Sequence, residues 1–277
     1  MALRDTSKMS SIQLPGLIDP HDLSTDRQFS MNLARGMQVL RAFSVREPLL
    51  GNRELSDRTG LAKPTISRLT YTLTLLGYLS VDAGLKKYRL GSGVLSLSHP
   101  LLASMRVRQA ARPLMEQLAQ KTGCSVNLGL RDRADVVYID TVRTDSANPY
   151  LPDIGSTRPL ISSAIGRALI LACPATERTA ILNYLRLQDR QNFDDCRSAW
   201  DADVNLFAQQ GYCHARGEWQ KDVHAIAMPV RLPQQDIPVA MNCTLASNRN
   251  PNEKLTRDVL PLLQNAVRQL QLLYGMR

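Results

Sequence analysis

The chain has few cysteines, and their spacing excludes the common cysteine-based sites. Five occur among 277 residues, whereas zinc sites and redox motifs need closely spaced pairs. We interpret them as reduced, mostly buried thiols without a role in metal binding or disulfides. They are Cys124, Cys173, Cys196, Cys213 and Cys243.

Long apolar runs are also missing. No stretch approaches the roughly 18 to 20 apolar residues that a membrane-spanning helix requires. The opening sequence MALRDTSKMSSIQLPG lacks the hydrophobic centre of a signal peptide. We therefore expect a cytoplasmic protein without a membrane partner.

Sequence motifs for catalysis are missing as well. The four histidines show no HExxH spacing, and there is no GxSxG elbow, Walker loop or GxGxxG turn. The nearest candidates for a nucleophile or a thiol sensor are Cys213 beside His214, and Cys243 with a histidine brought close by folding. Neighbouring residues of a strand point to opposite faces, which weakens the first pair. We predict neither an enzyme nor a bound cofactor.

What the chain does contain is a concentration of positive charge. Its net charge is +9. Between Ser30 and Ser98, ten lysines and arginines outnumber four acidic residues, so this segment holds two thirds of the net charge. Cationic side chains displace counterions from phosphate, so the segment is a source of affinity for double-stranded DNA without specifying a DNA sequence.

The same segment predicts a helix-turn-helix. The first helix fits residues 52–59, with Asn52 as its cap and Gly60 as its left-handed stop. The second helix opens at Pro64, whose fixed φ suits a first helical position, and ends at Gly77. A preceding helix over residues 31–43 carries apolar residues at helical spacing.

The second helix has two different sides. Its apolar residues recur on one side, which we expect to pack against the core, and its polar residues recur on another, which can enter a DNA groove. The packing side consists of Ile66, Leu69, Leu73 and Leu76. The groove side consists of Thr65, Arg68 and Thr72, flanked by Ser67 and Tyr71, with Lys63 at the start of the helix.

A basic hairpin follows this helix. The strands YLSV and KKYRL are separated by residues 82–84, a hairpin signal that leaves Lys86 and Lys87 on or beside a wing, close to phosphate. Three helices and this hairpin make a winged helix-turn-helix. The alternative interpretation is that the polar stripe and the hairpin form only a solvated surface, since amphipathic surface helices are common.

A linker comes next, with the sequence GSGVLSLSHPLLASM. Its apolar content exceeds what a simple tether requires, so we predict a linker helix that buries this surface against a second copy of the chain. Pro100 should bend or interrupt the helix. The alternative is that the linker packs only on its own domain.

The rest of the chain combines helices and strands. A helix that ends at Gly123, with Pro113 as a candidate break, precedes the strands SVNLGLR and DVVYIDTV. Three more strands fit YCHAR, HAIAMPVR and IPVAMNCT, the last two joined by residues 232–236. Helices fit residues 163–172, 175–186, 195–210 and 252–274. With strands on one side and helices on the other, we expect an α+β domain.

Several segments resemble IclR-type bacterial transcription regulators. LARGMQVLRAF, NRELSDRTGLAKPTISRLTYTLTLLGYL and KKYRLGSGVLSL are similar to the DNA-binding domain and linker of that family. GCSVNLGL, VVYIDTV, GSTRPLISSAIGRALILA, GYCHARGEWQKDVHAIAMPV and IPVAMNCTLAS are similar to its effector-binding domain, in the same order. The resemblance covers residues 30–275. It implies a GAF-like C-terminal domain and a homodimer formed through the first helix and the linker, which in such regulators often pairs into a dimer of dimers.

The resemblance also implies an effector site. In the family, a small organic acid lies between the central sheet and the loop ahead of the GRALILA helix. Exposed amides and helix N-termini attract carboxylates, so Gly155, Ser156, Thr157 and Arg158 are a sensible anion cradle. The alternative is that this loop is an ordinary surface connection and Arg158 belongs to a structural ion pair.

The last strand supplies two further candidates for effector binding. Asn242 and Thr244 alternate along it, point to one face and match positions where relatives place ligand-facing side chains. Ala225 stands where some members carry a cysteine, and Ala215 near where some carry an aspartate. This less polar and roomier site suits an aromatic or longer carboxylic acid.

The expected organisation therefore has four parts. They are a mobile N-terminal arm at 1–29, a winged helix-turn-helix domain at 30–91, a linker helix at 92–106 and an effector-binding domain at 107–277. We predict a regulator of catabolic genes that binds a DNA operator and responds to a small organic acid. The alternatives are a small-molecule-modifying enzyme with an appended basic domain and a thiol-based redox-sensing regulator.

Overall fold

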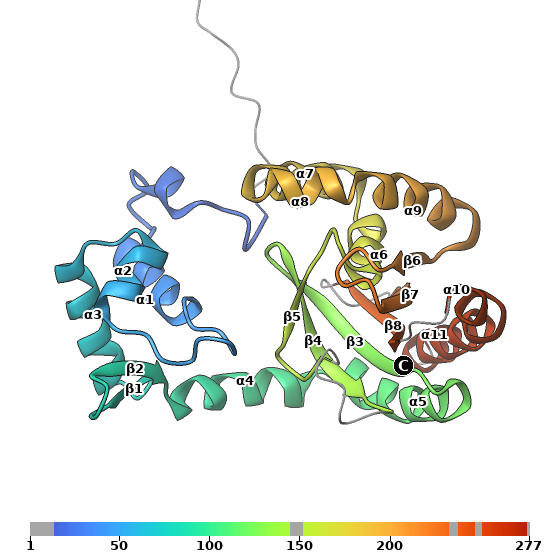
Figure 1. Cartoon of the computed structure of the whole chain (residues 1–277), viewed down its shortest axis with the longest axis horizontal. Helices are drawn as coiled ribbons and strands as arrows, with labels where there is room; N and C mark the ends of the chain where they lie inside the picture. The colour runs from blue at the N-terminus through green and yellow to red at the C-terminus, as the bar shows by residue number, and fades with distance from the viewer. Residues whose placement is uncertain (1–13, 145–151, 233–237, 247–250, 276–277) are drawn as a thin grey trace, which may run out of the picture. The chain divides into compact units, whose positions relative to one another are not determined.

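The computed structural model describes residues 14–144, 152–232, 238–246 and 251–275 (Figure 1). The chain divides into an N-terminal unit, Ile18–Met105, and a C-terminal unit, which begins at Arg106 and also includes the segment up to Leu17. Most of the connection expected at 232–236 and the middle of the loop ahead of the predicted GRALILA helix lie outside the described residues. No helix in the described ranges has the length and apolar character needed to cross a bilayer.

The N-terminal unit is a three-helix core with an antiparallel wing. The core forms around Val39, Leu55 and Ile66, all fully buried. Leu50, ahead of the second helix, forms a backbone bridge with Tyr88 of the wing. This is the winged helix-turn-helix that the sequence predicted. Its elements are α1 (Met31–Arg41), α2 (Asn52–Thr59), α3 (Lys63–Leu75), β1 (Leu79–Asp82) and β2 (Lys87–Leu90).

Two local expectations in this unit need correction. The residue that caps α2 is Gly51 and not Asn52, because the Glu54 carboxylate accepts the Gly51 N–H at 2.5 Å. Leu76 is 62% exposed and does not pack. Thr70 is buried on the packing side of α3, and its hydroxyl donates to the Ile66 carbonyl at 2.9 Å. Gly60 does end α2 in the left-handed region, with φ +70°.

The segment ahead of α1 has structure that was not expected. The sequence predicted a mobile arm, but the described part contains the short 3-10 helix η1 (Pro20–Leu23), capped by Asp19, whose side chain accepts the His21 N–H at 2.9 Å. Leu14 and Leu17 are partly buried and pack on the core of the C-terminal unit.

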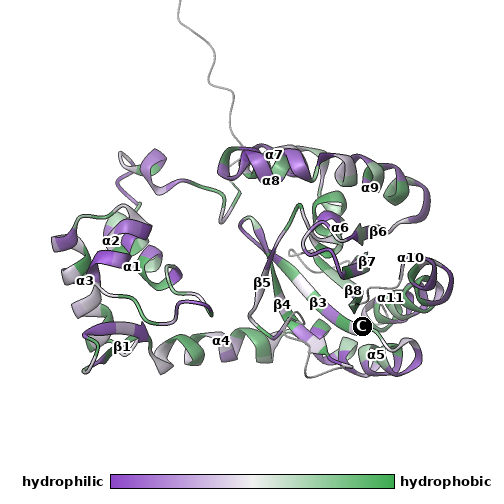
Figure 2. Cartoon of the chain, in the orientation of Figure 1, coloured by the Kyte–Doolittle hydropathy of each residue, from purple (hydrophilic) through white to green (hydrophobic). Residues whose placement is uncertain are grey.

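Neither of the two prolines that the sequence marked as sites of a bend or a break interrupts its helix. Helix α4 (Ser92–Ser104) continues through Pro100, and α5 (Arg106–Thr122) continues through Pro113. In α4 no residue is buried, so a carbonyl that loses its partner at the proline stays accessible to water. Figure 2 shows hydrophobic residues along α4 among neutral and hydrophilic ones.

The C-terminal unit is built on one antiparallel sheet. Its strand order is β5-β4-β3-β8-β7-β6, so the last strands of the unit insert beside the first ones (Figure 1). The strands are β3 (Ser125–Asp132), β4 (Asp135–Val142), β5 (Thr157–Pro159), β6 (Cys213–Arg216), β7 (Val223–Val230) and β8 (Val239–Ala246). The three-residue strand β5 lies in the stretch that the sequence predicted as a loop.

Helices cover both faces of this sheet, whereas the sequence predicted helices on one side only. On one face, Ala225 and Ala240 join a core cluster with α6 (Ala164–Ala172). On the other face, Arg112 of α5 donates to the buried carboxylate of Asp140 in β4 at 2.9 Å. Strand alternation makes both faces apolar, so both need a covering layer.

The remaining helices divide more finely than the sequence predicted. The helix expected at 195–210 is preceded by a separate short helix, and the last helix contains a π-helical turn. Pro261 lacks the N–H that would continue an α-helical ladder back into this turn. The elements are α7 (Ala175–Gln188), α8 (Arg190–Asp195), α9 (Arg197–Gln210), α10 (Asn252–Lys254), the π-turn η2 (Leu255–Val259) and α11 (Leu260–Gly275).

Candidate functional site

Helix α3 presents its polar side to solvent. Ile66 and Thr70 are fully buried on the opposite side, so the helical period turns Arg68 and Tyr71 outward. Of the residues that the sequence proposed for DNA contact on this helix, the exposed ones are Lys63, Ser67, Arg68, Tyr71 and Thr72, and Thr65 is partly exposed. The polar side of α3 is therefore a candidate DNA interface.

The structure separates these residues into two flanks. Thr65, Arg68 and Thr72 border a groove of about 580 Å³ between α1, α3 and α4. Much of the rest of the groove is apolar and includes Leu33 and Leu97. On the other flank, the Ser67 hydroxyl accepts a hydrogen bond from the Asn52 amide at 3.1 Å, which joins the start of α2 to α3. No pattern in the sequence had indicated this contact.

The two lysines of the wing differ in their surroundings. Lys86 is exposed, and its backbone adopts the left-handed conformation, with φ +53°. Lys87 is half-buried and forms an ion pair with Glu54, whose carboxylate also accepts the N–H of the α2 cap residue Gly51. The Lys87 ammonium and the Gly51 N–H hold the pKa of the Glu54 carboxyl below its usual value. Lys87 thus fastens the wing to α2, whereas Lys86 extends into solvent.

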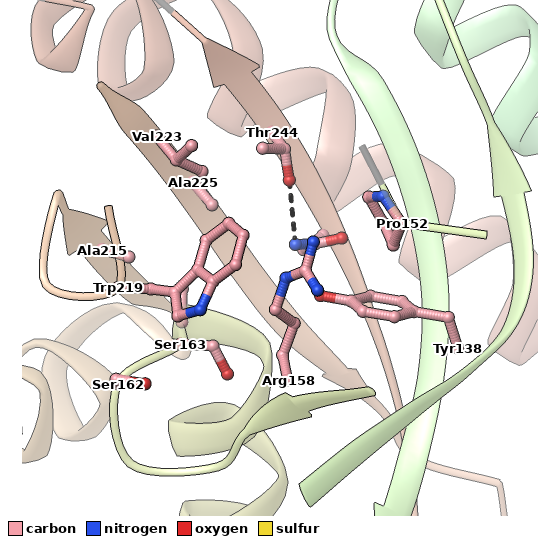
Figure 3. A pocket seen from close by; sticks show the side chains of 12 residues that line it. Tyr138, Pro152, Arg158, Ser162, Ser163, Ala215, Trp219, Val223, Ala225 and Thr244 are labelled. Atoms are coloured by element: carbon pink, nitrogen blue, oxygen red, sulfur yellow. Dashed lines mark hydrogen bonds between the residues drawn. The ribbon is translucent and has the colours of Figure 1, made fainter. Parts of the chain in front are cut away.

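A second candidate site lies in the C-terminal unit, between the sheet and the start of α6. It is a small cavity of about 40 Å³, and it is lined by residues from five strands, three loops and the start of α6 (Figure 3). Its lining residues are Tyr138, Pro152, Arg158, Ser162, Ser163, Ala164, Ala215, Trp219, Val223, Ala225, Asn242 and Thr244. Four of the predicted effector residues are among them: Arg158, Ala225, Asn242 and Thr244.

Arg158 crosses the mouth of this pocket. Figure 3 shows its side chain extending from β5 between the Trp219 ring and the Tyr138 hydroxyl. The guanidinium carbon lies 3.8 Å from the centre of the Trp219 ring, a cation–π contact. Burial lowers the pKa of Arg158, and burial raises the pKa of Tyr138 to about 12. The pocket therefore offers a partly desolvated cation beside a protonated phenol.

The floor of the pocket is a buried polar network. The Asn127 amide donates to the Asn242 oxygen at 2.9 Å and to the Thr244 hydroxyl at 3.4 Å. The Asn242 amide also donates to Thr244, at 3.1 Å, while Thr141 donates to the Asn127 oxygen at 2.7 Å. Because the Thr244 oxygen accepts two hydrogen bonds, its own proton is directed elsewhere. Asn242 and Thr244 do face the same cavity, as their spacing predicted.

Ser162 is a lining residue that the sequence analysis missed. It is 3% exposed, and among the described residues its hydroxyl has no hydrogen-bond partner. A buried hydroxyl without a partner is costly and uncommon in native structures. Tyr138 and Trp219 were missed as well. The only signal in the sequence was that Tyr138 lies two residues after Val136 in β4, so that both side chains point to the same face of the sheet.

Three of the four residues expected to form an anion cradle do not line the pocket. The Gly155 N–H donates to the Tyr138 carbonyl at 2.8 Å, and the Ser156 N–H donates to the Asp153 carbonyl at 2.9 Å. Thr157 is exposed. These amides stabilise the turn ahead of β5, so of the expected cradle only Arg158 reaches the cavity.

A buried ionic hub supports the loop that carries Trp219. Arg167 in α6 is completely buried and donates to the Asp203 carboxylate at 2.6 Å. It also bonds the His214 carbonyl at 3.1 Å and lies 3.8 Å from the carboxylate of Glu218, the neighbour of Trp219. The hub therefore ties α6, α9 and the β6–β7 loop together behind the pocket.

The cysteines lack the properties of reactive thiols. All five are buried, and burial raises the pKa of each thiol. A raised pKa disfavours the thiolate, which is the reactive form. Among the described residues, no three His, Cys, Asp or Glu side chains are grouped to hold a metal ion.

A winged helix-turn-helix joined by a linker helix to a pocket-bearing α+β domain defines a two-domain DNA-binding transcription regulator. Residues 32–83 match the family model for the IclR helix-turn-helix domain, and residues 99–272 match the model for the bacterial transcriptional regulator IclR C-terminal domain. The chain belongs to the IclR family of transcription regulators.

Individual relatives agree with this assignment. The chain is 32% identical to the transcriptional regulator TsaQ1/TsaQ2 of Comamonas testosteroni over 87% of each chain. It is 25% identical to the p-hydroxybenzoate hydroxylase transcriptional activator of Acinetobacter baylyi, over 92% of this chain and 96% of that one. The crystal structure of an IclR family regulator from Brucella abortus superposes with a TM-score of 0.83 at 41% identity, covering 90% of this chain and 94% of that chain.

Proposed function

We propose that the pocket in the C-terminal unit binds an aromatic or longer carboxylic acid and that this acid changes the affinity of the N-terminal unit for its operator. The observation that carries the proposal is the convergence of Arg158 with the Tyr138 and Ser162 hydroxyls on one small cavity. A cation and two hydroxyl donors suit a carboxylate. Trp219 and Ala225 supply the apolar wall that an aromatic ring requires.

The pocket as described is a closed form. A cavity of about 40 Å³ holds little more than a water molecule or two, whereas pockets for organic ligands are roughly 300 Å³ or larger. Arg158 and Trp219 both line this cavity and stack on each other across it. An entering acid would therefore separate this pair and take the guanidinium for its own carboxylate.

Relatives support an acid of the aromatic class. One curated relative is named for activating p-hydroxybenzoate hydroxylase. A solved IclR homologue from Microbacterium hydrocarbonoxydans contains 4-hydroxybenzoate; at 21% identity its likeness to this chain is one of fold. These names make hydroxybenzoates the first compounds to test, and catabolic genes for such acids the first candidate targets.

Calorimetry with the full chain tests the pocket. Benzoate and 4-hydroxybenzoate should bind, whereas the uncharged benzamide should bind at least roughly ten-fold more weakly, a difference of about 1.4 kcal/mol. Arg158→Met should remove this preference for the acid. The acid should also change operator affinity while its concentration in the assay stays constant, which separates a regulator from an enzyme. Equal binding of acid and amide would refute the proposed site.

For DNA binding, we propose that α3 enters the major groove and that the wing contacts phosphate. Arg68 is central on the exposed side of α3, and a guanidinium there can pair with a guanine edge. We assign DNA contact to Lys63, Thr65, Ser67, Arg68, Tyr71, Thr72, Lys86 and Lys87. Of these, Lys87 makes its contribution partly by holding the wing against α2.

We further propose that a second copy of the chain covers the apolar part, on α1 and α4, of the groove between α1, α3 and α4 and leaves its border on α3, with Thr65, Arg68 and Thr72, open to DNA. This arrangement gives a homodimer that can pair into a dimer of dimers. Leu33, Leu97 and Leu101 are each more than half exposed, which is unusual for leucines that have no partner surface. Leu97→Asp with Leu101→Asp should impair dimerisation and operator binding together, because one winged domain offers a single half-site. Gel filtration showing an unchanged oligomer would contradict this.

A further inference from the structure

The first described residues, Leu14, Pro15, Gly16 and Leu17, form a tight turn encoded by their sequence. The Leu17 N–H donates to the Leu14 carbonyl at 3.0 Å, and Gly16 has φ +83°. Proline in the second position and a left-handed glycine in the third are the residues that a type II β-turn demands. The turn therefore has a defined shape of its own.

This turn packs on the C-terminal unit. Leu14 and Leu17 contact the core cluster that includes Val136 and Leu160. Gly16 lies against Arg133 at the tip of the β3–β4 hairpin, where a Cβ added to Gly16 would come within 3.2 Å of the Arg133 side chain. Figure 1 shows the start of the described chain beside this tip. Glycine thus serves both the turn conformation and the close approach.

The position of the turn gives the N-terminal unit two covalent connections to the C-terminal unit. The chain leaves the C-terminal unit at Leu17, forms the unit Ile18–Met105 and returns at Arg106. The 13 residues from Ile18 to Ser30 can span at most roughly 45 Å when fully extended. While the turn is docked, the start of α1 must stay within that distance of the hairpin tip. If the linker were the only connection between the units, this limit would not apply.

The docking surface is continuous with the pocket. Tyr138 belongs to the core cluster under the turn and also lines the cavity. Leu160, in the same cluster, donates its N–H to the Ala134 carbonyl of the hairpin at 3.0 Å and lies two residues before Ser162. A ligand that shifts the Tyr138 or Ser162 wall therefore acts on the surface that holds the turn.

We propose that residues 14–17 are a strap that docks on the hairpin tip of the effector-binding domain, restricts the arrangements open to the DNA-binding unit and transmits part of the effector signal. Coupling requires an element whose state both sites bias. The strap, docked or released, is such an element, because it packs on the core cluster that includes the pocket residue Tyr138 and is joined along the chain to α1. The signalling role rests on the proposed function, whereas the docking does not.

The test compares two double variants of the full chain. Leu14→Asp with Leu17→Asp places two charges in the docked turn. Thr25→Asp with Gln28→Asp places the same charges at exposed positions further along the same segment. Hydrogen exchange at the hairpin tip, Asp132 to Ala134, should increase in the first variant and stay at the wild-type rate in the second. Unchanged exchange in the first variant would overturn the docking.

Regulation is measured on the same proteins with 4-hydroxybenzoate and operator DNA. In the strap variant, the ligand-induced change in operator affinity should fall by roughly five-fold, the lower end of usual coupling, while calorimetry shows wild-type affinity for the acid. The control variant should respond like the wild type. A released strap with full regulation would overturn the signalling role. If the acid does not change the operator affinity of the wild-type chain, the proposed function is refuted. The docking is then still decided by the hydrogen-exchange measurement.

Discussion

The two units of the chain place their polar residues in opposite ways. In the N-terminal unit, Thr70 is the single buried polar residue among those described, and its bond is made within its own helix. In the C-terminal unit, ten polar residues are buried on helices, strands and loops. These ten are Thr122, Ser125, Asn127, Asp140, Ser162, Arg167, Asp203, His214, Asn242 and Thr244.

This difference accords with the recognition that we propose for each unit: DNA in one, and in the other a small acid at the pocket lined by Ser162, Asn242 and Thr244. A DNA duplex is larger than the domain, so recognition residues must stand on the surface, where they cost the fold little. A small acid is surrounded, so its recognition residues must be buried and satisfied before it arrives. Substitutions of the exposed recognition residues of α3 should therefore affect binding alone, whereas substitutions of buried polar residues in the C-terminal unit should affect stability as well.

The largest effect is expected from Arg167→Met. The change leaves the Asp203 carboxylate buried without its cation, and breaking such a pair costs about 3 to 5 kcal/mol. Urea unfolding of the full chain measures the loss. Arg53→Met breaks an exposed pair with Asp57 in α2 and should cost less than about 1 kcal/mol. Similar losses in both variants would remove the distinction between the units.

The pH dependence of the Arg167→Met variant adds a second check. Burial already raises the pKa of Asp203 in the presence of Arg167, and removing the cation raises that pKa further. The folded variant then binds a proton more tightly than the unfolded chain does. Its stability deficit should therefore shrink as the pH falls through the raised pKa, and a deficit that grows on acidification would contradict the assigned pair.

Arg68→Ala should weaken operator binding without affecting stability. If the guanidinium contacts a base edge, roughly 1 to 3 kcal/mol of affinity and some sequence discrimination should be lost together. Arg190→Ala is the control, because that arginine is also exposed but lies on α8 of the other unit. Fluorescence anisotropy measures the affinity of each variant for operator DNA and for scrambled DNA. Wild-type affinity for the operator would exclude α3 as the reading helix.

The fold was largely predictable from the sequence because its signals are local. The left-handed residues Gly60 and Gly77 fall where the helix stops were expected, and β4 spans the predicted residues. Errors arose where a local signal has two outcomes. Pro100 can end a helix or be tolerated in an exposed one, and Asn52 and Gly51 are both acceptable caps.

The site was predictable only in part, because it depends on contacts between distant segments. Strand alternation placed Asn242 and Thr244 on one face, and the family resemblance pointed to Arg158. No local pattern reveals that Trp219 stacks on Arg158, or that the Ser162 hydroxyl is left without a partner. The prediction of an anion cradle was wrong at Gly155 for the same reason. The Gly155 N–H donates to the Tyr138 carbonyl of β4, and no local pattern in the sequence indicates that this loop pairs with β4.

Ser162→Ala is an exception to the rule that buried polar residues serve stability. Its hydroxyl has no partner among the described residues, so removing it should leave the free energy of unfolding unchanged or slightly raised. A ligand carboxylate would lose a hydrogen bond worth roughly 1.5 to 3 kcal/mol. Ser198→Ala, at an exposed serine of α9, is the control. Calorimetry that finds full acid affinity in Ser162→Ala would place the carboxylate elsewhere in the pocket.

The smallest effect on DNA affinity is expected from the two lysines of the wing, Lys86 and Lys87. Comparing their variants tests whether exposure alone decides which lysine contacts phosphate. Lys86 extends into solvent, so Lys86→Ala should reduce the slope of log affinity against log salt by about one unit, the signature of one lost phosphate contact, and leave sequence discrimination intact. Lys87 forms an ion pair with Glu54, so Lys87→Ala should change the salt slope less than Lys86→Ala does. It should instead loosen the wing. The measurement is hydrogen exchange at Leu50 and Tyr88, whose backbone bridge holds the wing to the core and whose exchange should become faster. Glu54→Gln should reproduce that exchange effect, because it removes the same ion pair from the other side. Equal slopes and equal exchange in Lys86→Ala and Lys87→Ala would mean that the ion pair does not hold the wing.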